Sequence, residues 1–187
     1  MKELLGLTAA ALAVLQAIPY FWDIFHHRTK PHLYTYLIWS IVTGLAFLGQ
    51  VAAGGGPGAW TTGVMTVITI AVLLLCFKYG TEDITALDAV FLGGALISII
   101  PWYLTSDPML SVVLATGIDV LAFLPTIRKT YNDPTSETLI SYISNLFRHP
   151  ISILALTSYS ITTVIYPAAL LVMNIIMVSV IVSRRRK

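Results

Sequence analysis

The chain has 187 residues, of which 57% are hydrophobic and only 11% are charged, and its mean hydropathy is +0.83. Because a soluble domain carries about 25% charged residues, this composition excludes a soluble domain and predicts a protein that lies in a lipid bilayer. The formal net charge of +2 comes mostly from the basic C-terminal tail.

Seven apolar segments follow one another along the chain, each of roughly 20 residues, the length that crosses ~30 Å of hydrocarbon as a helix. They cover about residues 4–25, 32–53, 59–78, 85–104, 108–128, 137–157 and 160–183. The predicted fold class is an all-α integral membrane protein with seven transmembrane helices in one domain, residues 1–187. The connections are too short for a catalytic domain or a nucleic-acid-binding module, so no nucleic acid is expected as a partner.

The first three segments resemble the last three. Residues 4–79 can be laid over residues 110–185 without a gap, so that the following pairs coincide: Pro19 with Pro125, Leu33 with Leu139, Tyr36 with Tyr142 and Lys78 with Arg184. Such repetition is typical of transporters, in which two similar bundles enclose a site near the membrane midplane.

The fourth segment has no partner in this repeat. Three helices alone would leave the second copy upside down, whereas a linker helix makes the two copies parallel. We therefore predict a 3+1+3 architecture, with a first repeat at 4–79, a linker helix within 80–107 and a second repeat at 108–185.

Basic residues predict the orientation in a cell (inner) membrane that the chain crosses many times. Of the 11 lysines and arginines, Lys2 lies on one side and Arg148 lies inside a segment, while nine lie on the other side: Arg28, Lys30, Lys78, Arg128, Lys129, Arg184, Arg185, Arg186 and Lys187. Since basic residues stay cytoplasmic, we expect the N-terminus outside and the C-terminus in the cytoplasm.

Each copy has a proline near the inner end of its first helix, in Pro19-Tyr20 and in Pro125-Thr126. With the 3+1+3 plan, these prolines make the chain resemble the PQ-loop superfamily, which includes the SWEET and SemiSWEET sugar carriers, cystinosin-type transporters and the KDEL receptor. The stretches 19–24, 29–32 and 123–129 are more closely similar to an uncharacterised group of bacterial membrane proteins. Tyr20 and Thr126 stand where the family has glutamine. The resemblance implies a carrier with a central cavity.

Two charged residues are expected deep in the membrane. Asp119 is 11 residues past Pro108 and Arg148 is 11 residues past Glu137, so both lie ~17 Å from opposite faces. Because isolated charges are costly at this depth, the two side chains are expected to pair. The pair is either a fixed link between two helices or part of a solute or proton site. A substrate carboxylate that displaced Asp119 would make an amino acid or organic acid plausible.

Other side chains at this depth predict a central cavity. Asn145 is three residues before Arg148 and shares its helix face, and its repeat partner is Trp39; Gln16 lies at similar depth. The resemblance implies substrate contact for Asn174. These residues suit a small solute with one polar edge and one flat or apolar face, although packing and interhelical hydrogen bonds are equally open explanations.

No catalytic group, metal site or cofactor is expected. The single cysteine, Cys76, has no thiol or histidine nearby in the sequence and is interpreted as a packing residue. The histidines His26, His27 and His32 lack a carboxylate or thiol to complete a ligand set, and His149 is interpreted as an interior residue. The glycine-rich stretch 54–58 lacks the lysine of a phosphate-binding loop and is expected to be a flexible outer turn.

The sequence favours a transporter or facilitator of a small polar solute that works by alternating access. Sugars, amino acids, organic acids and vitamins remain candidates, as do proton coupling and a homo-oligomer. Pro19 and Pro125 weaken their helices and are expected to act as hinges. The alternative is a KDEL-receptor-like binding protein without transport. An enzyme is not expected, because no nucleophile and base occur at a suitable spacing.

Overall fold

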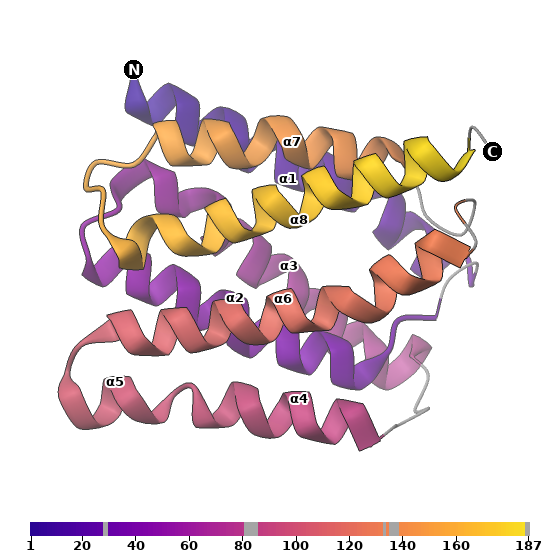
Figure 1. The fold of residues 1–187 in the computed structure, drawn as a ribbon, viewed down its shortest axis with the longest axis horizontal. Helices are drawn as coiled ribbons and strands as arrows, with labels where there is room; N and C mark the ends of the chain where they lie inside the picture. Colours follow the sequence, from indigo (N-terminus) through magenta and orange to yellow (C-terminus); the bar gives the residue numbers. More distant parts are fainter. Residues whose placement is uncertain (28–29, 81–85, 133, 135–138, 186–187) are drawn as a thin grey trace.

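The computed structural model is an all-helical bundle (Figure 1) that describes residues 1–27, 30–80, 86–132, 134 and 139–185. Within these residues the elements are α1 (Lys2–Phe25), α2 (Leu33–Ala52), the short 3-10 helix η1 (Gly56–Ala59), α3 (Trp60–Tyr79), α4 (Ala86–Ile97), α5 (Ile100–Thr105), α6 (Pro108–Asn132), α7 (Leu139–Leu154) and α8 (Ile161–Arg185). The prediction of an all-α chain with multiple apolar helices is confirmed.

Six helical segments of the described chain are long and apolar enough to cross a membrane: Lys2–Phe25, Leu33–Ala52, Gly56–Tyr79, Ala86–Thr105, Pro108–Asn132 and Ile161–Arg185. The seventh, α7, has only 16 residues and is shorter than the predicted segment 137–157. At 1.5 Å per residue it spans ~24 Å, a little less than the hydrocarbon thickness of ~30 Å. The chain therefore fits a multi-pass membrane protein.

The sequence predicts one continuous helix for the fourth segment, whereas the structure has two, α4 and α5. Pro101 lies at the start of α5 and has no N–H to donate, and the chain turns at residues 98 and 99. The Ser98 hydroxyl donates to the Ala95 carbonyl oxygen (2.7 Å), which stabilises the turn. In Figure 1, α5 continues in the direction of α4 along the edge of the bundle.

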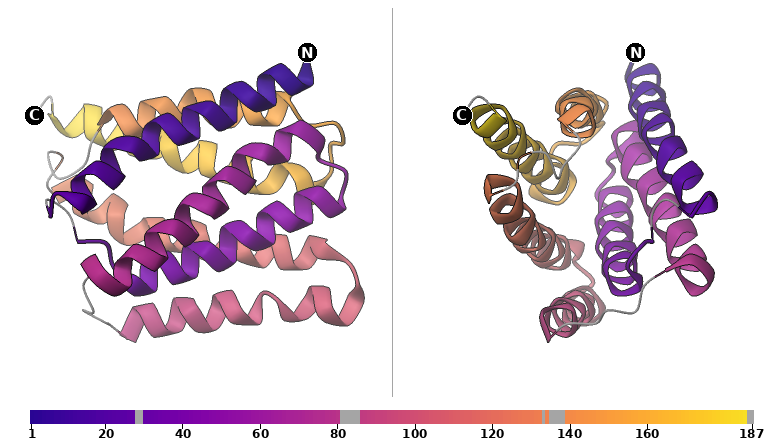
Figure 2. Two further views of the ribbon diagram at one scale, coloured as in Figure 1. Left: turned by 180° about the vertical axis from the view of Figure 1, so that it is seen from behind. Right: turned by 90° about the vertical axis from the view of Figure 1, so that its right-hand side faces the viewer.

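The helices form two groups of three. Helix α3 packs against both α1 and α2, and α8 packs against both α6 and α7. The groups meet where α2 contacts α6 and where α1 contacts α7, as the end-on view in Figure 2 illustrates. Helix α4 covers α2 and α6 at one edge. The two chain ends lie at opposite ends of the bundle (Figure 1).

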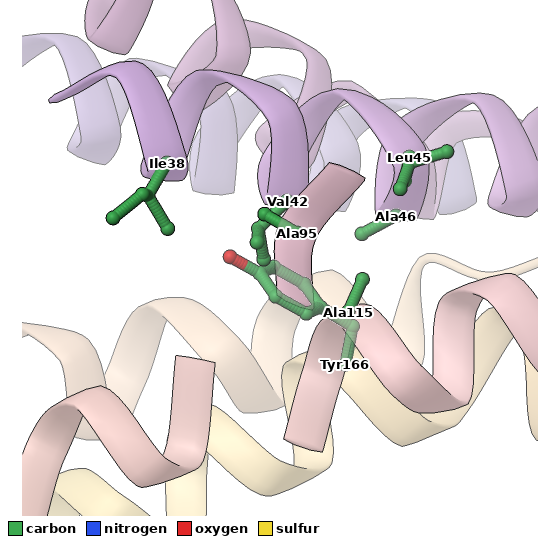
Figure 3. Packing of buried hydrophobic residues seen from close by; sticks show 7 residues of the cluster. All are labelled: Ile38, Val42, Leu45, Ala46, Ala95, Ala115 and Tyr166. Atoms are coloured by element: carbon green, nitrogen blue, oxygen red, sulfur yellow. The ribbon is translucent and has the colours of Figure 1, made fainter. Parts of the chain in front are cut away.

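A buried apolar cluster joins the two groups through α2, α4, α6 and α8. Its fully or nearly fully buried members are Ile38, Val42, Leu45, Ala46, Ala95, Ala115 and Tyr166 (Figure 3). Three of the seven are alanines, and small side chains let helices approach closely where lipid supplies no hydrophobic driving force. The Tyr166 ring of α8 lies among Val42, Ala95 and Ala115 and brings a hydroxyl group into this core.

The glycine-rich turn (residues 54–58) is a packed junction, so the expectation of a flexible turn is wrong. The Thr157 N–H donates to the Gly55 carbonyl oxygen (3.0 Å), and the Ser152 hydroxyl donates to the Gly58 carbonyl oxygen (2.8 Å). Gly56 has a φ of +59°, which favours glycine. The turn therefore holds the start of α3 against the end of α7 and closes one end of the bundle.

Replacing Gly58 with alanine should destabilise this junction. The added Cβ would lie 2.6 Å from Leu156 Cδ2 and 2.7 Å from the Leu156 backbone nitrogen, which cannot rotate away. Such overpacking costs about 1–3 kcal/mol. Thermal unfolding of the detergent-purified protein measures the loss. Gly93→Ala is the matched control, because a Cβ there meets nothing within 4 Å. Equal melting temperatures for the two variants would contradict the packed junction.

Candidate functional site

A cavity of about 220 Å³ lies between α1, α2, α3 and α7. Its polar and aromatic lining consists of Gln16, Tyr20, Tyr36, Trp39, Thr69, Ser141, Asn145 and Arg148, and its apolar lining of Ala13, Ala17, Met65, Ile68 and Val72. Drug-sized ligands occupy pockets of about 300–1,000 Å³, so this cavity suits a smaller molecule.

Four of the predicted site residues line this cavity together: Gln16, Trp39, Asn145 and Arg148. They come from α1, α2 and α7, which are brought together by the packing of α7 on α1 and of α3 on both α1 and α2. The remaining two, Asn174 and Asp119, do not line the cavity and lie behind its wall.

Asn174 lies one layer behind Asn145. The Asn145 Nδ2 group donates to Asn174 Oδ1 (2.9 Å), and Asn174 Nδ2 donates to the Leu170 carbonyl oxygen (2.7 Å). Asn174 is only 2% exposed. It therefore orients Asn145, and direct solute contact would have to come from Asn145.

Asp119 does not form the expected ion pair with Arg148. Among the residues that the structure describes, no nitrogen of Arg148 lies within 4.0 Å of a carboxylate oxygen. The Tyr166 hydroxyl instead donates to Asp119 Oδ2 (3.0 Å). The equal depth of the two charges did not bring them together, because helix rotation directs Asp119 toward α2 and α8.

Arg148 is 6% exposed and poorly satisfied. Its Nη1 group donates to the thioether sulfur of Met65 (3.1 Å), which is a weak acceptor, and its Nε group has no partner in the described part of the chain. The Oδ1 atom of Asn145 and Nε2 of His149 are also buried without a partner there. Most buried polar groups in proteins are hydrogen-bonded, so three open groups on one short helix mark a site with unused binding capacity.

Arg148 and Met65 separate the cavity from a second, smaller one of about 50 Å³. The smaller cavity is lined also by Tyr166, His149 and Ser152. At ~30 Å³ per water molecule it has room for one or two waters. The guanidinium group therefore lies between a space that can hold a solute and one that can hold water.

The aromatic side of the cavity includes two residues that the sequence analysis did not place in the site. The Tyr20 and Tyr36 rings stack with 6.0 Å between their centroids, and Tyr36 contacts Trp39 edge to face at 5.4 Å. Helical spacing could have indicated both residues. Tyr20 is four residues after Gln16, and Tyr36 is three before Trp39, so each shares a face with a predicted site residue.

The proposed hinge Pro19 lies inside α1 on the exposed surface, next to the cavity residue Tyr20. Helix α6 passes through position 125, but the Pro125 side chain lies outside the described residues. A hinge role for these two prolines stays a prediction.

Within the described residues, no group of three or more histidine, cysteine, aspartate or glutamate side chains is arranged to hold a metal ion. His26 Nδ1 lies 2.8 Å from the Trp22 carbonyl oxygen, and His32 contacts Thr35 and Asp88. These histidines therefore cap or link helices at the end of the bundle opposite the glycine-rich turn.

In comparisons with known proteins, no protein-family model, no curated protein and no solved structure matches this chain.

Replacing Tyr166 with phenylalanine should destabilise the protein by about 1–3 kcal/mol, because the buried Asp119 carboxyl group would lose a hydrogen-bond donor. In an Asp119→Leu background the same change should cost much less, with a coupling of at least about 1 kcal/mol between the two sites. Thermal unfolding of the four proteins measures this. Tyr103→Phe is the control, since Tyr103 is 87% exposed. Additive effects would argue against the bond.

Replacing Arg148 with methionine should not destabilise the empty protein and is expected to stabilise it by at least about 1 kcal/mol, because a buried charge without a full partner is removed. The unfolding temperature without added solute is the measurement. A clear loss of stability would instead indicate that Arg148 holds the helices together through a partner.

Proposed function

We propose that this protein is a membrane carrier of a small polar solute, which binds in the cavity between α1, α2, α3 and α7. The observation that carries the proposal is the cavity itself, lined by Gln16, Asn145 and Arg148 on one side and by Tyr36 and Trp39 on the other. A small cavity with a few convergent polar groups and an apolar wall is the usual form of a small-molecule site.

The proposed carrier has two parallel three-helix repeats related by an axis along the membrane normal, as in the PQ-loop superfamily. Helix packing supports this plan. If α1, α2 and α3 correspond to α6, α7 and α8, the packing of α3 on α1 and α2 corresponds to that of α8 on α6 and α7. The contact of α2 with α6 likewise corresponds to that of α7 with α1. Helices α4 and α5 then form the linker.

A third cavity supports the same plan. It has a volume of about 340 Å³, lies between α2, α4 and α6, and is lined in part by Thr35, Trp39, Ala122 and Thr126. These four are the repeat partners of four residues that line the first cavity, namely Ser141, Asn145, Gln16 and Tyr20. The two crevices are therefore equivalent by the sequence repeat, and Trp39 lies between them.

The position of the cavity suggests an inward-facing state. On α1 the lining extends from Ala13 to Tyr20, toward the end of the bundle at which α1 ends. At the opposite end the glycine-rich turn is packed against Leu156 and Thr157. With the N-terminus outside, the packed end is the outer one, and transport requires it to open while the inner end closes.

Counterflow in proteoliposomes tests the proposal. Vesicles loaded with unlabelled sugars, amino acids, organic acids or vitamins should take up the matching labelled solute faster than empty vesicles. Asn145→Leu should lower this uptake by about tenfold or more, because it removes a polar group that faces the solute. Ser179→Ala, an exposed change on α8, is the control.

A solute that binds and stabilises the protein but never shows counterflow would contradict the carrier. That result would favour the receptor-like alternative, for which a cavity closed at one end is sufficient.

A further inference from the structure

The interior cation Arg148 has no anionic partner among the described residues. Of the carboxylate residues that the structure describes, only Asp119 is buried, and its hydrogen bond to Tyr166 leaves Arg148 with the neutral sulfur of Met65. A buried guanidinium group is normally paired, because the low-dielectric interior makes an isolated charge costly. Arg148 lines the 220 Å³ cavity, so the missing partner can approach its guanidinium group from there.

The Asn145 side-chain oxygen, which lacks a hydrogen-bond donor among the described residues, indicates which group of the solute lies next to its anion. Asn174 Nδ2 donates to the Leu170 carbonyl, so Asn174 Oδ1 faces Asn145 and accepts from its Nδ2 group. This chain of bonds determines the orientation of the Asn145 amide and leaves its Oδ1 atom buried without a donor. Asn145 precedes Arg148 by three residues, so the open acceptor and the open donor lie side by side on one helix face.

We propose that the solute is a small 2-hydroxy carboxylate monoanion, with its carboxylate on Arg148 and its hydroxyl donating to Asn145 Oδ1. This inference rests on the proposed function, because it takes the cavity to be the solute site.

The net charge of the solute favours a hydroxyl over an ammonium group as the donor to Asn145 Oδ1. A monoanion neutralises Arg148, whereas an amino acid carries no net charge and would leave the buried site positive. The remaining walls, Tyr36, Trp39, Ile68 and Val72, are aromatic or apolar and suit the carbon body of the solute. The 50 Å³ cavity on the other side of Arg148 is too small for this solute, so the 220 Å³ cavity is the binding space next to Arg148.

Four matched probes test each element of this chemistry on the full-chain protein in detergent. Lactate has the carboxylate and the hydroxyl, propanoate lacks the hydroxyl, lactamide lacks the charge, and alanine replaces the hydroxyl with an ammonium group. Lactate should raise the unfolding temperature at the lowest concentration, and each other probe should need at least about tenfold more, because an unpaired buried polar group or charge is left in the site.

Three variants assign the contacts. Arg148→Met should abolish the response to lactate, and Arg148→Lys should retain part of it. Asn145→Leu should remove the preference for lactate over propanoate, a change that a purely structural role would not produce. Arg184→Gln, which removes a positive charge near the C-terminus, should respond as the unchanged protein does. If Arg148→Met fails to fold, the four probes and Asn145→Leu still decide the outcome.

Several outcomes would overturn the inference. Equal responses to lactate and lactamide would exclude the carboxylate, and a stronger response to alanine would indicate an amino acid instead. If glucose, but not lactate, stabilised the protein in an Asn145-dependent way and showed counterflow, the carrier function would stand and the anion proposal would fail. If no solute in the counterflow panel gave a response, both would fail.

Discussion

The interior of this bundle is organised by the need to satisfy polar groups where lipid cannot. Asp119 meets this need with Tyr166, and Asn174 meets it with Leu170 and Asn145. Arg148 does not, because within the described residues its Nη1 group bonds only to a thioether and its Nε group has no partner. The contrast separates the structural polar residues, which the protein satisfies itself, from the residues that remain open to a ligand.

The Asp119 carboxyl group also connects the core to the cavity. Its donor Tyr166 belongs to the apolar cluster between α2, α4, α6 and α8 (Figure 3) and also lines the 50 Å³ cavity beside Arg148. Trp39 lines two cavities and belongs to α2, which packs against α6 and α8, so the position of its ring depends on the packing of the two helix groups. A change in how α2 meets α6 and α8 would move the wall between the two crevices.

Under the proposed repeat, the two equivalent crevices are lined by different side chains. Gln16, Tyr20 and Asn145 line one crevice, whereas their partners in the other are Ala122, Thr126 and Trp39. One crevice thus presents the amide groups of Gln16 and Asn145, and the other is lined by Thr35, Trp39 and Thr126 and covered by α4. Two crevices with different linings would suit the carrier of a small asymmetric solute that is proposed above.

Composition and periodicity determined the all-helical membrane class, because every stretch of about 20 apolar residues must satisfy its own backbone hydrogen bonds as a helix in lipid. They also predicted the depth of Gln16, Trp39, Asn145 and Arg148, since depth follows from residue count along a helix. They could not predict which side chains meet, because a rotation of one helix exchanges partners without changing depth. Tertiary packing alone decided that Asp119 bonds to Tyr166, that the glycine-rich turn is packed, and that Arg148 faces a cavity without a carboxylate among the described residues.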